Sequence, residues 1–220
     1  MYNVLIGCDQ AYYNKWAITL LGSIQHYAPW VSLHCHIVNP TNFKQLPYVS
    51  YTTETKDLSD PDVFAGYLQA VRFIKAYELF PNSEPVIVID TDSICTQSFT
   101  EQEFDQVHLD QPVILYKEKT QRWLAGFISM GTGNFRKDFH DILLSIPLEK
   151  FKGFWDQTCL RTLNDQYKFK RCPSKWMIIG KSKNSNFLTL KGEQKELDEY
   201  LRRYKQIQSS IDIESDQSSD

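Results

Sequence analysis

The sequence predicts an α/β fold in which helices cover a largely parallel β-sheet. Two observations carry this prediction: short apolar runs of strand length alternate with longer segments of helical periodicity, and no internal repeat interrupts the alternation. A length of 220 residues, at about 150 per domain, favours one large domain. We expect this domain to span residues 1–208, and the Ser- and Asp-rich residues 209–220 to form a disordered tail or a linker to a further domain.

The expected strands are apolar runs that end at polar or turn-forming residues. Residues 85–89 (PVIVI) are apolar throughout, which is typical of a strand buried on both faces of a sheet. Residues 3–8 (NVLIGC) form a similar run near the start of the chain. Further strands are expected at residues 33–38, 113–116, 127–130 and 187–190.

The expected helices place apolar residues three or four positions apart. The pattern in residues 15–27 ends before Pro29, and the pattern in residues 60–79 begins at Asp60-Pro61, a typical helix start. Further helices are expected at residues 135–144, 156–163 and 194–207. Ligands of open α/β sheets bind at the carboxyl ends of the strands, so residues that directly follow strands are the first candidates for a site.

Charge and cysteine content exclude several classes of protein. With 24 Lys and Arg against 27 Asp and Glu, the formal net charge is −3, which disfavours a nucleic-acid partner. No apolar run approaches the ~18 residues of a membrane span, and no signal sequence is evident. Five cysteines without a C-x-x-C pair indicate a reducing compartment, so we expect a soluble, cytoplasmic protein. In His34-Cys35-His36, strand alternation puts both histidines on one face, which favours a half-buried strand over a zinc site.

Carboxylates follow two of the expected strands. Asp9 ends the first strand, and Asp90 and Asp92 follow the most apolar one as a D-x-D motif. Two carboxylates at this spacing suit a hard divalent cation, Mn²⁺ or Mg²⁺, which takes its other ligands from water and substrate phosphates. Carboxylates delivered to a sheet edge by a buried strand are costly to place there without a ligand.

The segment VIVIDTDSICTQSF resembles the D-x-D segment of GT-A glycosyltransferases, in particular the family-8-like retaining enzymes of the glycogenin and lipopolysaccharide galactosyltransferase type. Further segments resemble blocks of this family in the same order along the chain: NVLIGCDQAYY, LLGSIQHY, AVRFIKAYELFP, LAGFISM, WDQTCL and FLTLKGEQK. The resemblance implies a GT-A fold with a mixed, mostly parallel central sheet flanked by helices, and a catalytic domain over residues 1–208. The short chain is similar to compact domains encoded by large DNA viruses and phages, which would place it in the host cytoplasm.

The resemblance also implies roles for individual residues. Asp90 and Asp92 would hold the metal, and Asp156 and Gln157 would act on the transferred sugar, with Gln157 near the anomeric carbon. The residues implied to contact the nucleotide-sugar donor are Asp9 and Tyr12 at the base, and Arg72, Thr91, Ala125, Gly126, Gly192 and Lys195 at the sugar and diphosphate.

The chain departs from the family pattern at two of these blocks. Thr189 stands where the family usually has a histidine as third metal ligand, and a hydroxyl is the weaker ligand. Leu124 stands where the family has an asparagine before Ala-Gly, which alters sugar recognition. Three tryptophans, Trp123, Trp155 and Trp176, are candidates for lining an acceptor groove.

The expected function is therefore a retaining glycosyltransferase that moves a hexose-type sugar from a UDP-sugar to a glycan or protein-linked acceptor. A nucleotidyltransferase shares the architecture and the carboxylate–metal chemistry, but the turn CDQAYYNKW after the first strand lacks the glycines of a triphosphate loop. A non-catalytic module that binds a nucleotide sugar or a glycan is the third possibility, and the departures at Thr189 and Leu124 keep it open.

Overall fold

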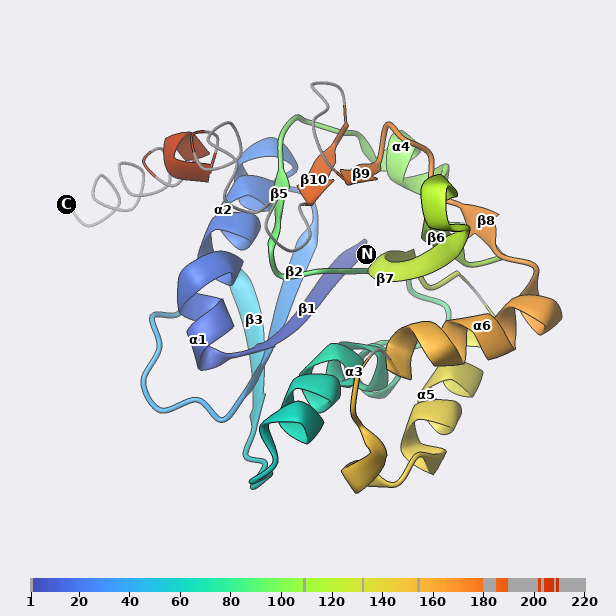
Figure 1. Cartoon of the computed structure of the whole chain (residues 1–220). Helices are drawn as coiled ribbons and strands as arrows, with labels where there is room; N and C mark the ends of the chain where they lie inside the picture. The colour runs from blue at the N-terminus through green and yellow to red at the C-terminus, as the bar shows by residue number, and fades with distance from the viewer. Residues whose placement is uncertain are drawn as a thin grey trace.

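A mixed sheet with strand order β3-β2-β1-β4-β7-β6-β8 forms the centre of the described fold (Figure 1). The computed structural model describes residues 2–108, 110–131, 133–153, 155–179, 185–189, 202, 204–207 and 209. Gly192, Lys195 and most of the expected C-terminal helix and tail lie outside these residues. The strands of the central sheet are β1 (Asn3–Asp9), β2 (Ser32–Val38), β3 (Val49–Glu54), β4 (Val86–Ile89), β6 (Val113–Lys117), β7 (Arg122–Ser129) and β8 (Lys170–Arg171).

The pairing of the strands brings three chain segments to one edge of the sheet. Strands β1, β2, β3 and β4 pair in parallel, so their carboxyl ends lie at the same edge. Strand β7 runs antiparallel to β4, and Ile89 pairs with Phe127, so Gly126 and Ala125 continue β7 past the end of β4. A smaller sheet of β5 (Ser93–Cys95), β10 (Phe187–Thr189) and β9 (Met177–Ile179) lies beyond that edge, in the order β5-β10-β9.

Helices cover both faces of the central sheet, as predicted. The described helices are α1 (Gln10–Tyr12), the π-helical turn η1 (Tyr13–Ala17), α2 (Ile18–Tyr27), α3 (Pro61–Leu79), α4 (Glu101–Asp105), the 3₁₀ turns η2 (Glu118–Thr120) and η3 (Leu148–Lys150), α5 (Phe135–Ser145) and α6 (Trp155–Tyr167). Helix α2 packs on one face, and α3, α5 and α6 pack together on the other (Figure 1).

Alternation along the central strands produces the two cores. In β4, Ile87 and Ile89 are buried in the core under α2, whereas Val86 and Val88 are buried under α3 and α5. Because β4 is buried on both faces, its sequence is apolar at every position. Asp90 directly follows this buried strand and therefore lies at the edge of the sheet, next to the core.

Most elements lie where the sequence predicts them, and the differences have physical reasons. The first helical segment begins at Gln10 instead of residue 15, because the Asp9 side chain accepts a hydrogen bond from the Tyr12 backbone N–H (2.8 Å) and caps it. Proline has no N–H for the ladder, and Pro85 accordingly precedes β4. Trp176 is 1% exposed in the core against Phe99 and Phe187, so the expectation that it lines an acceptor groove is wrong.

The two histidines of β2 lie on one face, as the alternation predicts. His34 Nε2 and His36 Nδ1 each lie 2.9 Å from the hydroxyl of Thr52 on the neighbouring strand, while Cys35 is buried in the opposite core. Burial, followed by the charge of His36, lowers the pKa of His34 to about 4, and burial also lowers the pKa of His36. These rings are therefore neutral structural groups near pH 7.

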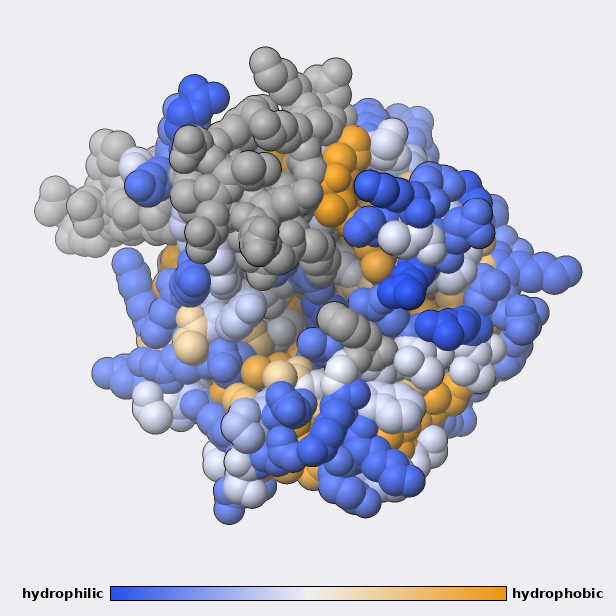
Figure 2. Space-filling model, in the orientation of Figure 1, coloured by the Kyte–Doolittle hydropathy of each residue, from blue (hydrophilic) through white to orange (hydrophobic). Residues whose placement is uncertain are grey.

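The described surface carries no extended apolar area on the face seen in Figure 2, where hydrophobic residues occupy small separate areas among hydrophilic ones. Among the helices that the structure describes, none combines the length and the apolar character needed to cross a membrane.

Candidate active site

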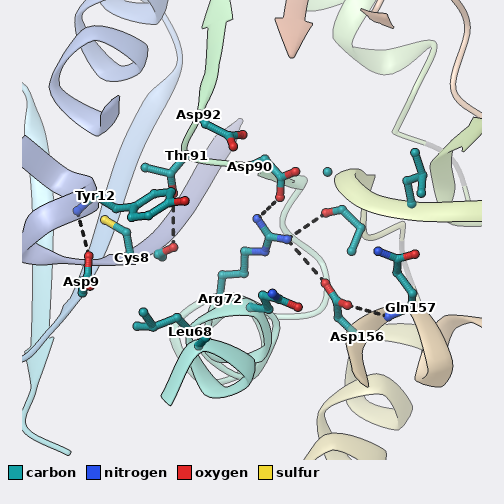
Figure 3. A pocket seen from close by; sticks show the side chains of 16 residues that line it. Cys8, Asp9, Tyr12, Leu68, Arg72, Asp90, Thr91, Asp92, Asp156 and Gln157 are labelled. Atoms are coloured by element: carbon teal, nitrogen blue, oxygen red, sulfur yellow. Dashed lines mark hydrogen bonds and ion pairs between the residues drawn. The ribbon is translucent and has the colours of Figure 1, made fainter. Parts of the chain in front are cut away.

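A cavity of about 300 Å³ opens at the carboxyl ends of β1 and β4. Its wall is formed by residues of β1, α1, α3, the β4–β5 turn, β7 and α6, which are Gly7, Cys8, Asp9, Tyr12, Ala65, Leu68, Gln69, Arg72, Asp90, Thr91, Asp92, Leu124, Ala125, Gly126, Asp156 and Gln157. Ten residues expected from the sequence to form the site line this cavity: Asp9, Tyr12, Arg72, Asp90, Thr91, Asp92, Ala125, Gly126, Asp156 and Gln157. Five stretches of the chain thus meet at one place (Figure 3).

The D-x-D motif is held in a turn between β4 and β5. The backbone N–H of Asp90 donates to the Gly126 carbonyl (2.9 Å), and that of Ser93 donates to the Asp90 carbonyl (3.1 Å). The Thr91 hydroxyl donates to the Gly7 carbonyl on β1 (3.3 Å). Thr91 is therefore a residue that ties the turn to β1, and the two carboxylates on either side of it are fixed relative to both strands.

Arg72 lies between two carboxylates at the centre of the cavity (Figure 3). Its Nη1 is 2.5 Å from Asp90 Oδ1, and its Nη2 is 3.7 Å from Asp156 Oδ2 and 3.2 Å from the Ala125 carbonyl oxygen. Arg72 is 5% exposed and Asp156 is 3% exposed, so these charges are almost removed from water. A buried charge without a partner is strongly unfavourable, and the three side chains therefore form one electrostatic unit.

Asp156 and Gln157 lie in the first turn of helix α6. Asp156 Oδ1 accepts a hydrogen bond from the backbone N–H of Gln157 (2.7 Å), which is one of the donors that the first turn of a helix leaves unpaired. The positive end of the helix dipole further favours a carboxylate at this position. Burial, followed by the charge of Asp156, raises the pKa of Cys159 to about 11, so this thiol stays protonated near pH 7.

Tyr12 stands at the opposite end of the cavity from Gln157 (Figure 3). Its side chain is 44% exposed, in contrast to Tyr13, which is fully buried in the core. An exposed ring on a cavity wall presents an aromatic face to a ligand. Asp9, which caps the backbone of Tyr12, lies beside it.

The structure adds lining residues that the sequence analysis did not single out. Ala65, Leu68 and Gln69 lie on the same face of α3 as Arg72, at positions i, i+3, i+4 and i+7. Gln69 Oε1 is buried and has no hydrogen-bond partner among the described residues. In the sequence, only its position three residues before Arg72 indicates that Gln69 faces the site. A glutamine on an amphipathic helix otherwise resembles an ordinary polar residue.

The described donor set fits a hard divalent cation. Four aspartates against one arginine give the lining residues a formal charge of −3, and the ligands on offer are oxygens. Among the described residues, no three His, Cys, Asp or Glu side chains form a metal-binding group, so Asp90 and Asp92 would need further oxygens. Thr189 pairs in register with Ser93, next to Asp92, and its buried hydroxyl has no partner among the described residues. That unsatisfied oxygen supports the fit.

The mixed sheet, the acidic turn after its central parallel strand and the helices on both faces together define a GT-A fold. Solved glycosyltransferase structures share this architecture. The galactosyltransferase LgtC, in complex with donor and acceptor sugar analogues, superposes with a TM-score of 0.67 at 12% identity over 96% of each chain. The bifunctional glycosyltransferase WbbM gives 0.64 at 14% identity over 94% of this chain and 49% of its own. GlyE of Streptococcus pneumoniae TIGR4, also a glycosyltransferase, gives 0.61 at 11% identity over 97% of this chain and 64% of its own.

These likenesses confirm the fold that the sequence predicts. No protein-family model matches the sequence, and the search of curated proteins found no match either. The chain therefore has the GT-A glycosyltransferase fold with little sequence identity to the solved structures that share it.

Proposed function

We propose that the protein is a retaining glycosyltransferase that transfers a hexose-type sugar from a UDP-sugar to a glycan or glycoprotein acceptor, using Mn²⁺ or Mg²⁺ bound to Asp90 and Asp92. The observation that carries the proposal is the acidic cavity at the sheet edge, where an exposed tyrosine, a buried arginine and four aspartates lie together. The GT-A fold shared with solved glycosyltransferases supports sugar transfer as the type of reaction.

Tyr12 and Asp9 are the proposed base-binding residues. The exposed ring of Tyr12 offers a stacking surface, and base–aromatic stacking contributes about 1–3 kcal/mol. The Asp9 carboxylate, which already accepts one backbone N–H, can accept an imide N–H of uracil through its other oxygen. This pairing favours a uracil base over one that presents only acceptors at that point.

Arg72, Ala125 and Gly126 are proposed to contact the sugar and diphosphate. The buried Nε of Arg72 has no hydrogen-bond partner among the described residues. Its N–H is therefore available to donate to an oxygen of the nucleotide sugar. Gly126 lies on the strand that borders the motif, and a residue without a side chain there allows close approach. Gly192 and Lys195 remain proposed diphosphate contacts from the sequence.

A divalent cation is favoured by charge. A nucleoside diphosphate is anionic, and the formal charge of −3 on the described lining would repel it. Asp90 and Asp92 would hold the cation, with the Thr189 hydroxyl as a further oxygen. When bound, the cation would neutralise the charge that develops on the leaving diphosphate.

In the proposed reaction, the bond between the anomeric carbon and the diphosphate oxygen breaks. A bond forms on the same face between that carbon and an acceptor hydroxyl, whose proton goes to the departing phosphate oxygen. Gln157 would stabilise the positive charge of the anomeric carbon through its amide oxygen, and Asp156 would orient sugar hydroxyls. An active-site mutant of LgtC, in which glutamate replaces a glutamine, supports a glutamine at this kind of site.

The test is hydrolysis and binding of UDP-sugars with and without Mn²⁺, in wild type and in Asp92→Asn. The variant should lose metal-dependent UDP binding, whereas Asp165→Asn, a matched change on the exposed surface of α6, should keep it. Unchanged binding and turnover in Asp92→Asn would refute the metal assignment. Donor binding without any turnover would instead identify a non-catalytic module, the alternative that Thr189 and Leu124 motivate.

A further inference from the structure

Arg72 contacts Asp90, one of the two carboxylates proposed to hold the cation. The contact between Arg72 Nη1 and Asp90 Oδ1 is short, at 2.5 Å, whereas the contact between Nη2 and Asp156 Oδ2 is longer, at 3.7 Å. Of the two carboxylates, Asp90 is therefore the stronger partner of the guanidinium. A charged side chain that is 5% exposed cannot exchange this partner for water without a large cost.

The base of the Arg72 side chain is fixed by the packing of α3 against β1. A Cβ built on Gly7 would lie 2.9 Å from Arg72 Cβ, 3.2 Å from its Cα and 3.3 Å from its N, so the two backbones are in close contact. Because the start of the side chain cannot move, only its guanidinium end can change position. In the part of the chain that the structure describes, Asp90 and Asp156 are the carboxylates that form ion pairs with that end.

We propose that Arg72 is a positioning residue that serves as the internal counter-cation of Asp90, and that a divalent cation displaces it toward Asp156. The proposal rests on the metal site of the proposed function. A cation on Asp90 removes the attraction that holds Nη1 and repels the guanidinium, and Asp156 is then the remaining anionic partner among the contacts described. Binding of the cation is thereby coupled to the first turn of α6, since Asp156 also accepts the N–H of Gln157.

The coupling predicts that Arg72 weakens metal binding while the donor is absent. To bind the cation, Asp90 must give up its charged hydrogen bond to Arg72. The loss of such a bond is enough to weaken Mn²⁺ affinity about tenfold or more. Without nucleotide, Arg72→Met is therefore expected to bind Mn²⁺ at least about tenfold more tightly than wild type. Arg72→Lys keeps the charge but loses the planar guanidinium, which can contact two partners at once. Its Mn²⁺ affinity is expected to lie between those of wild type and Arg72→Met.

The measurement is Mn²⁺ titration by isothermal calorimetry or electron paramagnetic resonance, without nucleotide, on proteins whose folding is checked by circular dichroism. Arg161→Met, which removes the same charge from an exposed position of α6, is the matched control and should bind Mn²⁺ as wild type does. Equal Mn²⁺ affinity of wild type and both Arg72 variants would overturn the proposal while leaving the metal site intact. Absence of Mn²⁺ binding in every variant would overturn the metal site and the proposal together.

A second comparison decides the question even if the Arg72 variants fail to fold. Asp156→Asn removes the partner to which Arg72 would move, whereas Asp9→Asn removes an equal charge from the same cavity wall without a contact to Arg72 among those described. Asp156→Asn is expected to weaken Mn²⁺ binding severalfold more than Asp9→Asn does. Equal weakening by the two substitutions would mean that only overall charge matters, and it would overturn the exchange of partners.

Discussion

Gly7→Ala tests the contact that fixes Arg72 in the cavity. The added Cβ would meet the Cβ, Cα and N of Arg72 at 2.9, 3.2 and 3.3 Å, all shorter than ordinary van der Waals contact. None of these atoms is the flexible end of a side chain, so β1 and α3 must move apart by a few tenths of an ångström. Overpacking of this kind costs about 1–3 kcal/mol, and we expect the free energy of unfolding to fall by that amount.

The same displacement should disturb the site. Movement of α3 shifts the guanidinium relative to Asp90 and the Ala125 carbonyl, so donor affinity should fall even at temperatures where the variant is fully folded. Urea denaturation followed by tryptophan fluorescence gives the free energy of unfolding, and calorimetry with UDP-sugar and Mn²⁺ gives the affinity. A Cβ on Gly66, which also lies on α3, would be 2.0 Å from the Phe151 carbonyl oxygen, so Gly66→Ala should destabilise the protein at least as much as Gly7→Ala does. A Gly7→Ala protein within about 0.5 kcal/mol of wild type would refute the close packing of β1 on Arg72.

Tyr12→Ala should weaken UDP binding about tenfold or more without loss of stability, whereas Tyr12→Phe should retain the affinity, because the exposed ring stacks but does not pack in the core; equal calorimetric affinities of the two variants would contradict stacking. Gln69→Leu should leave UDP affinity unchanged and lower the affinity for a UDP-sugar severalfold. The reason is that the unsatisfied Oε1 can accept only from an N–H or O–H, which the sugar has and the diphosphate lacks. An equal loss of UDP affinity would mean that Gln69 does not contact the sugar. Because folding lowers the pKa values of His34 and His36, the unfolded chain takes up protons at a higher pH than the folded protein does. The stability that these neutral histidines contribute is fully present above pH ~6.5 and is lost as the pH falls toward 4. Urea midpoints between pH 7 and 4.5 should fall less steeply in Thr52→Val combined with His34→Gln than in Thr52→Val alone, and parallel curves would exclude His34 as a source of the acid sensitivity.

The sequence predicted that Asp9, Asp90 and Asp92 come together, because they end or follow strands that share one sheet edge, and all three line the described cavity. Asp9 is the last residue of β1, Asp90 directly follows β4, and the two strands pair in parallel, so a correct assignment of two apolar runs places both carboxylates at the same sheet edge. The same logic fails for Gly7, whose role depends on a helix that approaches it from a distant part of the chain. It also fails for Gln69, because a single glutamine in a helical pattern looks like a residue exposed to solvent.

Short and polar strands were missed for a related reason. Strand β3 (VSYTTE) has few apolar residues, and it is held by its register with β2 and by the contact of Thr52 with two histidines. Strands β8 and β9 span two and three residues, which is too short for a periodic signal. Trp176 shows the opposite error, since a large aromatic residue was expected at a groove and instead fills the core.

Charge also bears on which nucleotide the cavity favours. The nucleotidyltransferase alternative requires a nucleoside triphosphate, which carries about two more negative charges than a nucleoside diphosphate sugar at neutral pH. Against a described lining of four aspartates and one arginine, each added charge is unfavourable unless basic residues or backbone N–H groups are aimed at it. Asp9 ends β1 and caps the helix that begins at Gln10, and its side chain accepts the backbone N–H of Tyr12, so this donor is not aimed at a phosphate. The acidic lining therefore supports the proposed nucleotide-sugar donor over a triphosphate.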